Sequence, residues 1–402
     1  METDIHLFFE EDEVMKKMIS MTLAVAMTMS LLAGCGNSNA GTESASGDTF
    51  KIGGIGPVTG GAAIYGQAVK NGAELAIKEI NEAGGINGYQ IEYNFQDDEM
   101  DNEKAVNAYN TLKDWGMNIL VGAVTSGCCV AVAAESQNDN LFQITPSGSS
   151  VDCINGNENV FQVCFTDPNQ GVGAADYIGQ NNIATKVAVI YDSSDVYSSG
   201  IFAKFKEEAA SQNFEIVSEE AFTADNKTDF SVQLAKAQEA GADLVFLPIY
   251  YSEASLILKQ ADSMGYAPKF FGCDGLDGIL GVENFDQKLA EGVMLLTPFA
   301  ADAKDDATQK FVSAYEAAYG ETPNQFAADA YDAVYVVKAA VEKCEATPAD
   351  SVTDLCDKLK AAMQEISYDG LTGDSMSWSA DGTVNKAPKA MEIKNGAYAL
   401  VQ

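Results

Sequence analysis

The sequence contains no arginine, and its only histidine, His6, lies ahead of a segment that we expect to be removed. Without histidine the mature chain lacks the usual general base near neutral pH, histidine-containing triads and imidazole metal sites. Without arginine, a ligand carboxylate must be held by backbone N–H groups, hydroxyls and helix N-termini. Because these absences remove most hydrolase mechanisms, we predict a protein that is not an enzyme.

Positive charge is scarce throughout: 24 basic residues face 59 acidic residues, and the formal net charge is −35. A field of this sign repels phosphate backbones and anionic lipid headgroups. Nucleic acid is therefore excluded as an expected partner.

Cofactor and metal motifs are also missing. The glycines of segment 54–60 resemble a dinucleotide loop, but the third falls one position late and Pro57 interrupts the backbone donors. None of the eight cysteines forms a C-x-x-C pair, which argues against zinc or thioredoxin chemistry. Cys153 with Cys164, and Cys344 with Cys356, are close enough in sequence to form disulfides, although buried thiols remain the alternative. We expect no cofactor and no metal.

The N-terminus has the pattern of an export signal. Lys16 and Lys17 precede the apolar residues 18–32, a stretch shorter than the roughly 20 residues that span a bilayer. Residues 1–14 carry six acids, which is wrong for the start of a signal, so we expect translation to begin at Met15. Residues 1–34 are the predicted signal peptide.

The signal ends in Leu32-Ala33-Gly34-Cys35, which resembles a bacterial lipobox, whose cysteine is acylated and becomes the first mature residue. An ordinary signal with a chance cysteine is the alternative. Residues 36–47 have the small, polar composition of a flexible tether. We therefore expect residues 35–49 to be a lipid anchor and tether, with the exported protein held at the outer face of the cell membrane through Cys35 alone.

The remaining chain is too long for one typical core, and two units are the natural expectation. Short β-rich runs alternate with amphipathic stretches, beginning with a strand at 51–56, a helix at 67–83 stopped by Gly84-Gly85, and a strand at 90–95. The rhythm restarts after Asp167-Pro168. This alternation predicts an α/β fold of two Rossmann-like lobes with parallel sheets.

Two neighbouring predicted strands end in polar residues. Segment 122–127 closes one strand and opens a helix at Ser126, and segment 144–150, with Ser147 and Ser149, closes the next. Ligands of open parallel sheets bind at the carboxyl ends of the strands, where helix N-termini point. A plain N-cap is the alternative role for Ser126, but two adjacent polar strand ends favour a binding site.

The chain resembles the type I periplasmic binding proteins, in particular the leucine/isoleucine/valine-binding subfamily, over nearly all of residues 50–402. The resemblance rests on the two strand ends and on four further motifs in order: Gly56-Pro57-Val58-Thr59-Gly60 with Tyr65-Gly66, residues 81–88, Phe165-Thr166-Asp167-Pro168, and Tyr250-Tyr251 ahead of a helix. It implies two lobes joined by a hinge, the first of residues 50–166 and about 297–375, the second of residues 167–296 and about 376–402.

The resemblance also implies a ligand set. Ser126 and Ser149 match positions that hold the α-carboxylate of an amino acid, and the carbonyl at Ser147 receives the α-ammonium. Asp274 matches an acidic position opposite the ammonium, where the subfamily carries the longer Glu. Aromatic positions that wall the pocket match Tyr65, Tyr197 and Tyr250 or Tyr251.

The expected function is that of a solute-binding lipoprotein that closes over a small amino acid, branched-chain or related, and delivers it to the permease of an ABC importer. We expect a monomer. One alternative is a sensor of the same fold that reports an amino acid or amide to a signalling receptor. The other, an exported enzyme, would need paired acids in the cleft, for which Asp274 and Asp277 are the candidates.

Overall fold

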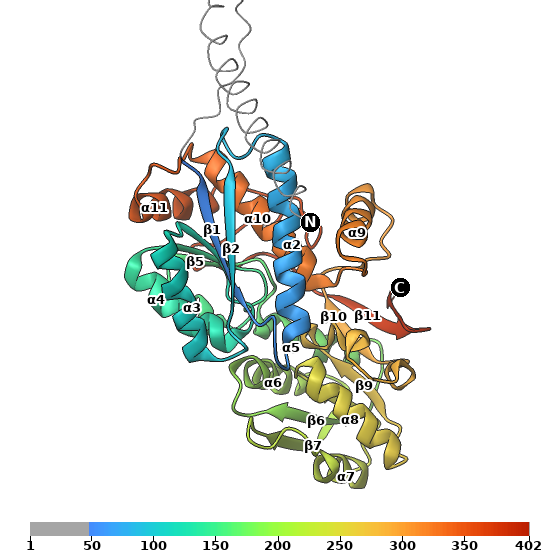
Figure 1. Ribbon diagram of the computed structural model, residues 1–402. Coiled ribbons are helices and arrows are strands. Elements are labelled where there is room, and N and C mark those ends of the chain that lie inside the picture. Colours follow the sequence, from blue (N-terminus) through green and yellow to red (C-terminus); the bar gives the residue numbers. More distant parts are fainter. Residues whose placement is uncertain (1–47, 402) are drawn as a thin grey trace, which may run out of the picture. The chain divides into compact units, whose positions relative to one another are not determined.

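A computed structural model describes residues 48–401, so the predicted signal peptide and the predicted acylation site, Cys35, lie outside the described residues. The first sheet is entirely parallel, and its strands run in the order β2-β1-β3-β4-β5 (Figure 1). Its strands are β1 (Phe50–Gly56), β2 (Ile91–Asp97), β3 (Ile119–Gly122), β4 (Phe142–Thr145) and β5 (Val160–Gln162).

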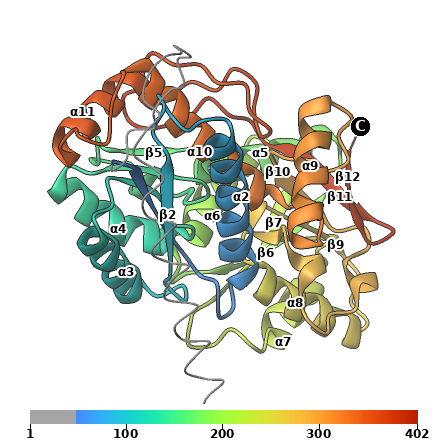
Figure 2. The same ribbon diagram turned by 45° about the horizontal axis from the view of Figure 1, so that its top comes forward.

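Helices from both ends of the chain cover this sheet. They are α2 (Ala63–Glu82), α3 (Asn102–Trp115), α4 (Ser126–Asp139), α10 (Gln325–Lys343) and α11 (Val352–Met363), while α9 (Asp306–Tyr319) contacts α2. Helix α10 packs along α2, as Figure 2 shows. A Cβ atom on Gly72 would lie 2.1 Å from the Ala327 carbonyl oxygen, so only glycine permits this close approach. The late helices thus return to the first sheet.

The second sheet has the order β12-β11-β10-β9-β8-β6-β7. Its strands are β6 (Lys186–Asp192), β7 (Glu215–Phe222), β8 (Leu244–Leu247), β9 (Lys269–Gly272), β10 (Met294–Thr297), β11 (Lys389–Lys394) and β12 (Ala397–Leu400). Its helices are α5 (Asp167–Gln180), α6 (Val196–Ala209), α7 (Ser231–Glu239) and α8 (Tyr251–Ser263), with the short 3₁₀ turns η2 (Asp274–Leu276), η3 (Ile279–Gly281) and η4 (Gln287–Ala290). A further 3₁₀ turn, η1 (Val151–Cys153), follows β4 in the first lobe.

The second sheet departs from the all-parallel expectation at one edge. Strand β11 pairs antiparallel with β10 and with β12, whereas the other five strands pair in parallel. The hairpin is closed by Asn395 and Gly396, both at positive φ, which is the conformation that a tight hairpin turn needs. The fold is otherwise the predicted pair of α/β lobes.

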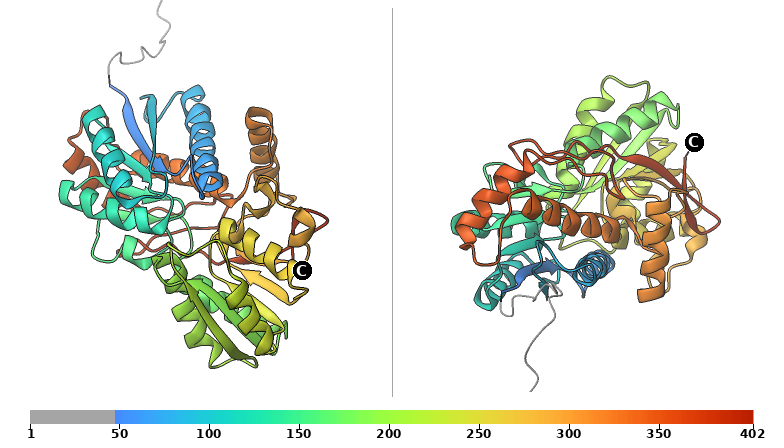
Figure 3. Two further views of the ribbon diagram at one scale, coloured as in Figure 1. Left: turned by 60° about the horizontal axis from the view of Figure 1, so that its bottom comes forward. Right: turned by 90° about the horizontal axis from the view of Figure 1, so that it is seen from above.

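The chain passes between the two sheets three times: after β5, after β10, and through the segment that precedes β11. Figure 3 shows the two lobes and these connections from two further sides. The last connection is held to the first lobe by the Trp378 indole N–H, which donates to the Gln162 carbonyl at 2.7 Å, and by a buried ion pair between Lys386 and Asp329. Three such connections form the hinge of a two-lobe protein.

All seven cysteines of the described residues are free, and only Cys344 is not fully buried. The two disulfides suggested by sequence spacing are therefore wrong in this structure, and burial as small apolar side chains is the role observed. Within residues 48–401, no helix combines the length and apolar character that a membrane crossing requires.

Candidate ligand-binding site

The first wall of the site is formed where β3 and β4 end side by side. Ser126 is the first residue of α4 rather than its N-cap, which is Thr125, and the Thr125 side chain makes no capping hydrogen bond. The first amides of a helix have no partner within the helix and carry the positive end of its dipole. Helix α4 therefore offers N–H donors to an anion without any arginine.

Hydroxyls tie the two strand ends together. The Ser126 hydroxyl accepts the Ser150 N–H at 3.2 Å, and the Ser147 hydroxyl donates to the Val124 carbonyl at 2.7 Å. Ser149 is 1% exposed, yet its hydroxyl makes no hydrogen bond. An unpaired buried hydroxyl is costly, so Ser149 retains a donor for a ligand or a water molecule.

The second wall is built around Asp274, which follows β9 in the other sheet. The Asp274 carboxylate accepts the Tyr197 hydroxyl at 2.7 Å, and its backbone N–H donates to the Gln170 side chain at 3.1 Å. Burial raises the pKa of Asp274 to about 7, against the opposing effects of its Tyr197 and Gln170 contacts. A nearby cation would favour the charged carboxylate.

A second buried acid, Asp167, lies at the start of α5 and was not predicted as a site residue. It is 1% exposed, and neither carboxylate oxygen accepts a hydrogen bond. Burial raises the pKa of Asp167 well above its usual value. The signal available in the sequence was its position, because Asp167 follows β5 at the same sheet edge as Ser149.

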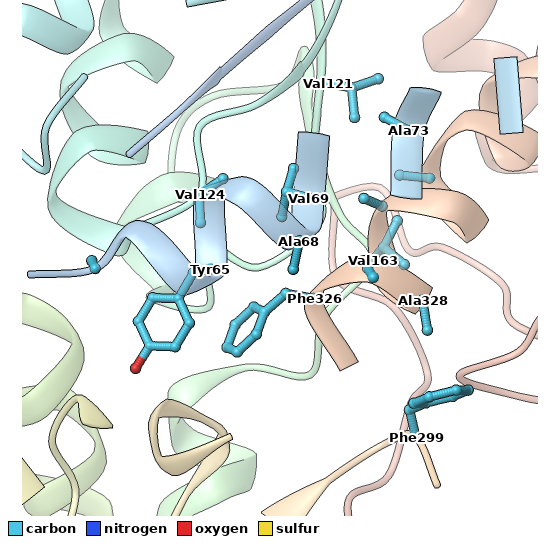
Figure 4. Packing of buried hydrophobic residues seen from close by; sticks show 14 of the residues in the cluster. Tyr65, Ala68, Val69, Ala73, Val121, Val124, Val163, Phe299, Phe326 and Ala328 are labelled. Atoms are coloured by element: carbon cyan, nitrogen blue, oxygen red, sulfur yellow. The ribbon is translucent and has the colours of Figure 1, made fainter. Parts of the chain in front are cut away.

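Aromatic rings close the space between the walls. The Tyr65 and Phe326 rings lie 4.4 Å apart, and Figure 4 shows them side by side. Tyr250 stacks on Tyr197 at 4.9 Å and meets Tyr65 edge-on at 5.7 Å. These contacts bring rings from both lobes against one cavity.

The cavity gathers most of the predicted residues. It is lined by Tyr65, Val124, Thr125, Ser126, Ser147, Tyr197, Tyr250, Asp274, Gly275 and Phe326. Tyr251 is not among them, because its hydroxyl turns away to accept the Ile64 N–H at 3.2 Å. Ser149 is not a lining residue either. Phe326 was not predicted as a site residue, because no local motif marks it.

A second cavity, of about 800 Å³, contains none of the predicted residues. It lies between α2, α9 and the β11–β12 hairpin, and Asp277 is on its wall. The Asp277 carboxylate accepts the Gln325 N–H at 2.9 Å, a hydrogen bond that does not involve the Asp274 carboxylate. The two acids considered for a catalytic pair therefore line different cavities.

Metal-binding geometry is not found among residues 48–401, where no three His, Cys, Asp or Glu side chains gather as ligands would. The arrangement instead offers hydroxyls and helix amides on one side and buried carboxylates on the other. That set is complementary to a small zwitterion.

Known proteins of one family resemble this chain over nearly its whole length. The family model described as periplasmic binding protein matches residues 49–397. "Leu/Ile/Val-binding protein homolog 3" of Brucella melitensis is 33% identical over 313 residues, covering 76% of this chain and 82% of that protein. The "leucine-, isoleucine-, valine-, threonine-, and alanine-binding protein" of Pseudomonas aeruginosa is 29% identical over 329 residues, covering 81% and 85%.

Solved structures of similar fold include two amino-acid-binding proteins. The branched-chain amino acid transporter substrate-binding protein LivJ of Streptococcus pneumoniae, in complex with isoleucine, superposes with a TM-score of 0.79 at 32% identity. The match covers 88% of this chain and 99% of LivJ. The leucine-binding protein LivK of Thermotoga maritima gives a TM-score of 0.79 at 25% identity, covering 88% and 98%.

Proposed function

Because this chain belongs to the periplasmic binding protein family, we propose that it is the substrate-binding protein of an ABC importer and captures an aliphatic α-amino acid between its lobes. One observation carries the proposal: a single cavity between the lobes joins the α4 N-terminus and serines of one lobe to the buried Asp274 of the other. The relatives named for leucine, isoleucine and valine support the ligand class, branched-chain or related.

The carboxylate of the ligand would lie at the α4 N-terminus. The helix amides, the Ser126 hydroxyl and the unpaired Ser149 hydroxyl are the donors present there. A carboxylate held this way exchanges its hydrating water molecules for oriented hydrogen-bond donors. These donors take the place of the arginine side chain that the sequence lacks.

The ammonium would lie at the opposite end, between the Ser147 carbonyl and Asp274. Burial alone disfavours charge on Asp274, so a bound ammonium and the carboxylate stabilise one another's charged forms. Asp167 is a second buried carboxylate of the same lobe, and the charge of Asp274 adds to the effect of burial in raising the pKa of Asp167. The site is therefore selective for a cationic group at this end.

Binding would close the lobes by hinge motion, with no covalent step. Tyr65 on α2 donates its hydroxyl to the Gly275 carbonyl and accepts the Tyr251 N–H at 3.2 Å. The Ile64 N–H donates to the Tyr251 hydroxyl. These bonds join α2 to elements of the second sheet, so opening the lobes must break them. Lobes of residues 50–166 with about 297–375, and 167–296 with about 376–402, are part of the proposal.

The proposal includes the predicted lipid anchor. Acylation of Cys35 after removal of residues 1–34 would hold a monomer at the outer face of the membrane, next to the permease.

Calorimetric titration of the purified domain with the twenty amino acids tests the proposed function. We expect micromolar or tighter binding of at least one aliphatic L-amino acid, and no binding of its decarboxylated amine or its deaminated acid, each of which lacks one charged end. The absence of binding by every amino acid would contradict the proposal.

A further inference from the structure

The second cavity, between α2, α9 and the β11–β12 hairpin, is separate from the candidate site. Its volume of about 800 Å³ lies within the range of small-molecule pockets, about 300–1,000 Å³. Among the described residues, none lines both cavities. Figure 4 shows the Phe299 ring of the second cavity apart from the Tyr65 and Phe326 rings of the candidate site. A molecule bound here would therefore occupy a site of its own.

Most of the wall of the second cavity is apolar, and it comes from both lobes. The first lobe contributes Ile64 and Ala68 of α2, which lies beside α9 in Figure 2. The second lobe contributes Leu280 of η3 and Met391 of β11, and Phe299 lies on the connection after β10. Such a wall favours a ligand with an apolar body, because burying that body removes apolar surface from water.

The charged side chains of this wall are all acidic. Asp302, Glu316 and Glu321 are exposed, whereas Asp277 is only 4% exposed. No lysine of residues 48–401 lines the cavity, and the sequence contains no arginine. A wall with charge of one sign attracts cations and repels carboxylates and phosphates.

Asp277 supplies a buried acceptor on this wall. One carboxylate oxygen accepts the N–H of Gln325, the first residue of α10, at 2.9 Å, and the other oxygen accepts no hydrogen bond. The neighbouring Tyr398 hydroxyl accepts the Gly278 N–H at 2.9 Å and makes no hydrogen bond to that oxygen. Burial raises the pKa of Asp277 to about 6, against the opposing effects of the Gln325 amide and the Tyr398 hydroxyl. An unpaired buried oxygen is costly, so it favours a ligand that brings both an N–H donor and a positive charge.

An ammonium group fits this wall better than a metal ion does. No three His, Cys, Asp or Glu side chains within residues 48–401 gather as metal ligands would, so Asp277 would be the only buried carboxylate offered to an ion. Calcium and magnesium each require about six oxygen ligands. An ammonium can instead pair with one carboxylate, while the rest of the ligand covers the apolar wall.

We propose that the second cavity binds a small organic amine, with its ammonium group at Asp277 and its apolar body against α2, η3 and α9. An amino acid is disfavoured here, because its carboxylate would meet acidic side chains and no basic one. The proposal is independent of amino-acid capture at the candidate site, because the two cavities share no residue.

Calorimetric titration of the protein at pH 7.5 with 4-phenylbutylamine tests the ligand class. We expect the amine to bind at least about tenfold more tightly than 4-phenylbutan-1-ol, which keeps the apolar body but lacks the charge. The anion 4-phenylbutanoate and the short cation methylamine should not bind measurably. Equal binding of the alcohol, or of methylamine, would overturn the proposal, because the first removes the role of the charge and the second removes the role of the apolar body.

Asp277→Asn tests the position of the ammonium, and the affinity for 4-phenylbutylamine should fall by about tenfold or more. Asp98→Asn is the matched control. Asp98 is also buried, with one oxygen bound to the Met100 N–H at 2.9 Å, the other unpaired and its pKa raised by burial to about 6, but it lines neither cavity. Its variant should keep the wild-type affinity for the amine.

Two further variants distinguish the cavities and cover the case in which Asp277→Asn does not fold. Asp274→Asn changes the candidate site alone, so amine affinity should stay the same. Val312→Trp places a large side chain from α9, at a half-buried position, into the second cavity and should abolish amine binding. Loss of amine binding in Asp274→Asn, or unchanged amine binding in the folded variants of Asp277 and Val312, would overturn the proposal.

Discussion

At the scale of single residues, Asp274 is the group on which ligand charge depends. In Asp274→Asn the ammonium loses its counter-charge, and removal of one partner of a buried pair costs about 3–5 kcal/mol. Amino-acid affinity should therefore fall at least about a hundredfold, while the unliganded melting temperature does not fall, because Asn keeps the shape of the side chain. Calorimetry and thermal unfolding measure the two effects.

The pH dependence of binding gives a control for Asp274. Its pKa is about 7 without ligand, and the ammonium requires the charged form, so affinity should rise from pH 5.5 to pH 8. In Asp274→Asn, affinity should no longer show the increase between pH 5.5 and pH 8 that deprotonation of Asp274 causes. An unchanged affinity in the variant would make Asp274 a purely structural residue.

The serines differ in what their loss should do. Ser149→Ala removes a hydroxyl that makes no hydrogen bond, so binding should weaken by about 1–2 kcal/mol without loss of unliganded stability. Ser126→Ala also strands the buried Ser150 N–H, so it should lower both affinity and stability. Unchanged affinity in both variants would refute the carboxylate role.

Residue positions were predictable where the main chain decides them. Ser126, Ser147 and Asp274 follow buried strands, and parallel strands end at one edge. Tyr250 and Tyr251 show the limit: Tyr250 caps α8 and faces the cavity, whereas Tyr251 begins the helix and faces Ile64. One step along a chain that is turning into a helix changes the direction of the side chain. Phe326 could not be found, because it reaches the cavity only through the packing of α10 on α2.

At the scale of elements, the buried ion pair in the last hinge connection should stabilise the fold. Lys386 is 5% exposed and donates to Asp329 at 2.7 Å. Lys386→Met would leave Asp329 buried without its counter-charge, so the free energy of unfolding should fall by about 3–5 kcal/mol in urea titrations.

The control variant for this pair is Lys206→Met. Lys206 pairs with Glu219 at a similar distance of 2.7 Å, but both side chains are partly exposed, so its loss should cost at most about 1 kcal/mol. Equal effects of the two variants would mean that burial does not strengthen the Lys386 pair. The double variant Lys386→Met, Asp329→Leu should recover much of the lost stability, because it removes the stranded charge.

Elements were predicted where periodicity and stop signals are strong, and missed where they are weak. Helix α2 ends at Glu82, just before the two glycines, but begins at Ala63, four residues earlier than expected, because no capping side chain marks its start. Strands β11 and β12 are short, and β11 begins and ends with lysine, so their alternation is faint, and their antiparallel pairing depends on a turn at Asn395 and Gly396. The crossing of the late helices to the first lobe depends on tertiary packing alone.

At the scale of the whole molecule, the predicted anchor decides where the protein works. Cys35→Ala should leave an unprocessed precursor that takes up no labelled fatty acid, because the acylated sulfur is gone. Membrane fractionation after metabolic labelling measures this outcome, and Cys344→Ala serves as the matched control. Continued lipid labelling of Cys35→Ala would contradict the anchor.

Acid titration should reveal how much unfavourable charge the unliganded protein buries. Among the described residues, burial raises the pKa of several carboxyls above 3.8: Asp98, Asp277, Asp332 and the half-buried Asp195 to about 6, Asp274 to about 7, and Asp167 and Asp329 also upward. A raised folded pKa means that the folded state binds more protons than the unfolded state between pH 3.8 and about 7. Stability must therefore decrease as pH rises through this window.

We accordingly expect the unliganded melting temperature to be higher at pH 5.5 than at pH 8, by roughly 5 °C or more. A saturating concentration of amino acid should make the melting temperature less dependent on pH. The bound ammonium stabilises the charged form of Asp274, which removes the contribution of Asp274 to the pH dependence. Asp274→Asn should flatten the slope to the same extent without ligand. A melting temperature that rises with pH across this window would show that these carboxyls are already paired or hydrated in the unliganded protein, and the charge pattern assigned to the cleft would have to be redrawn.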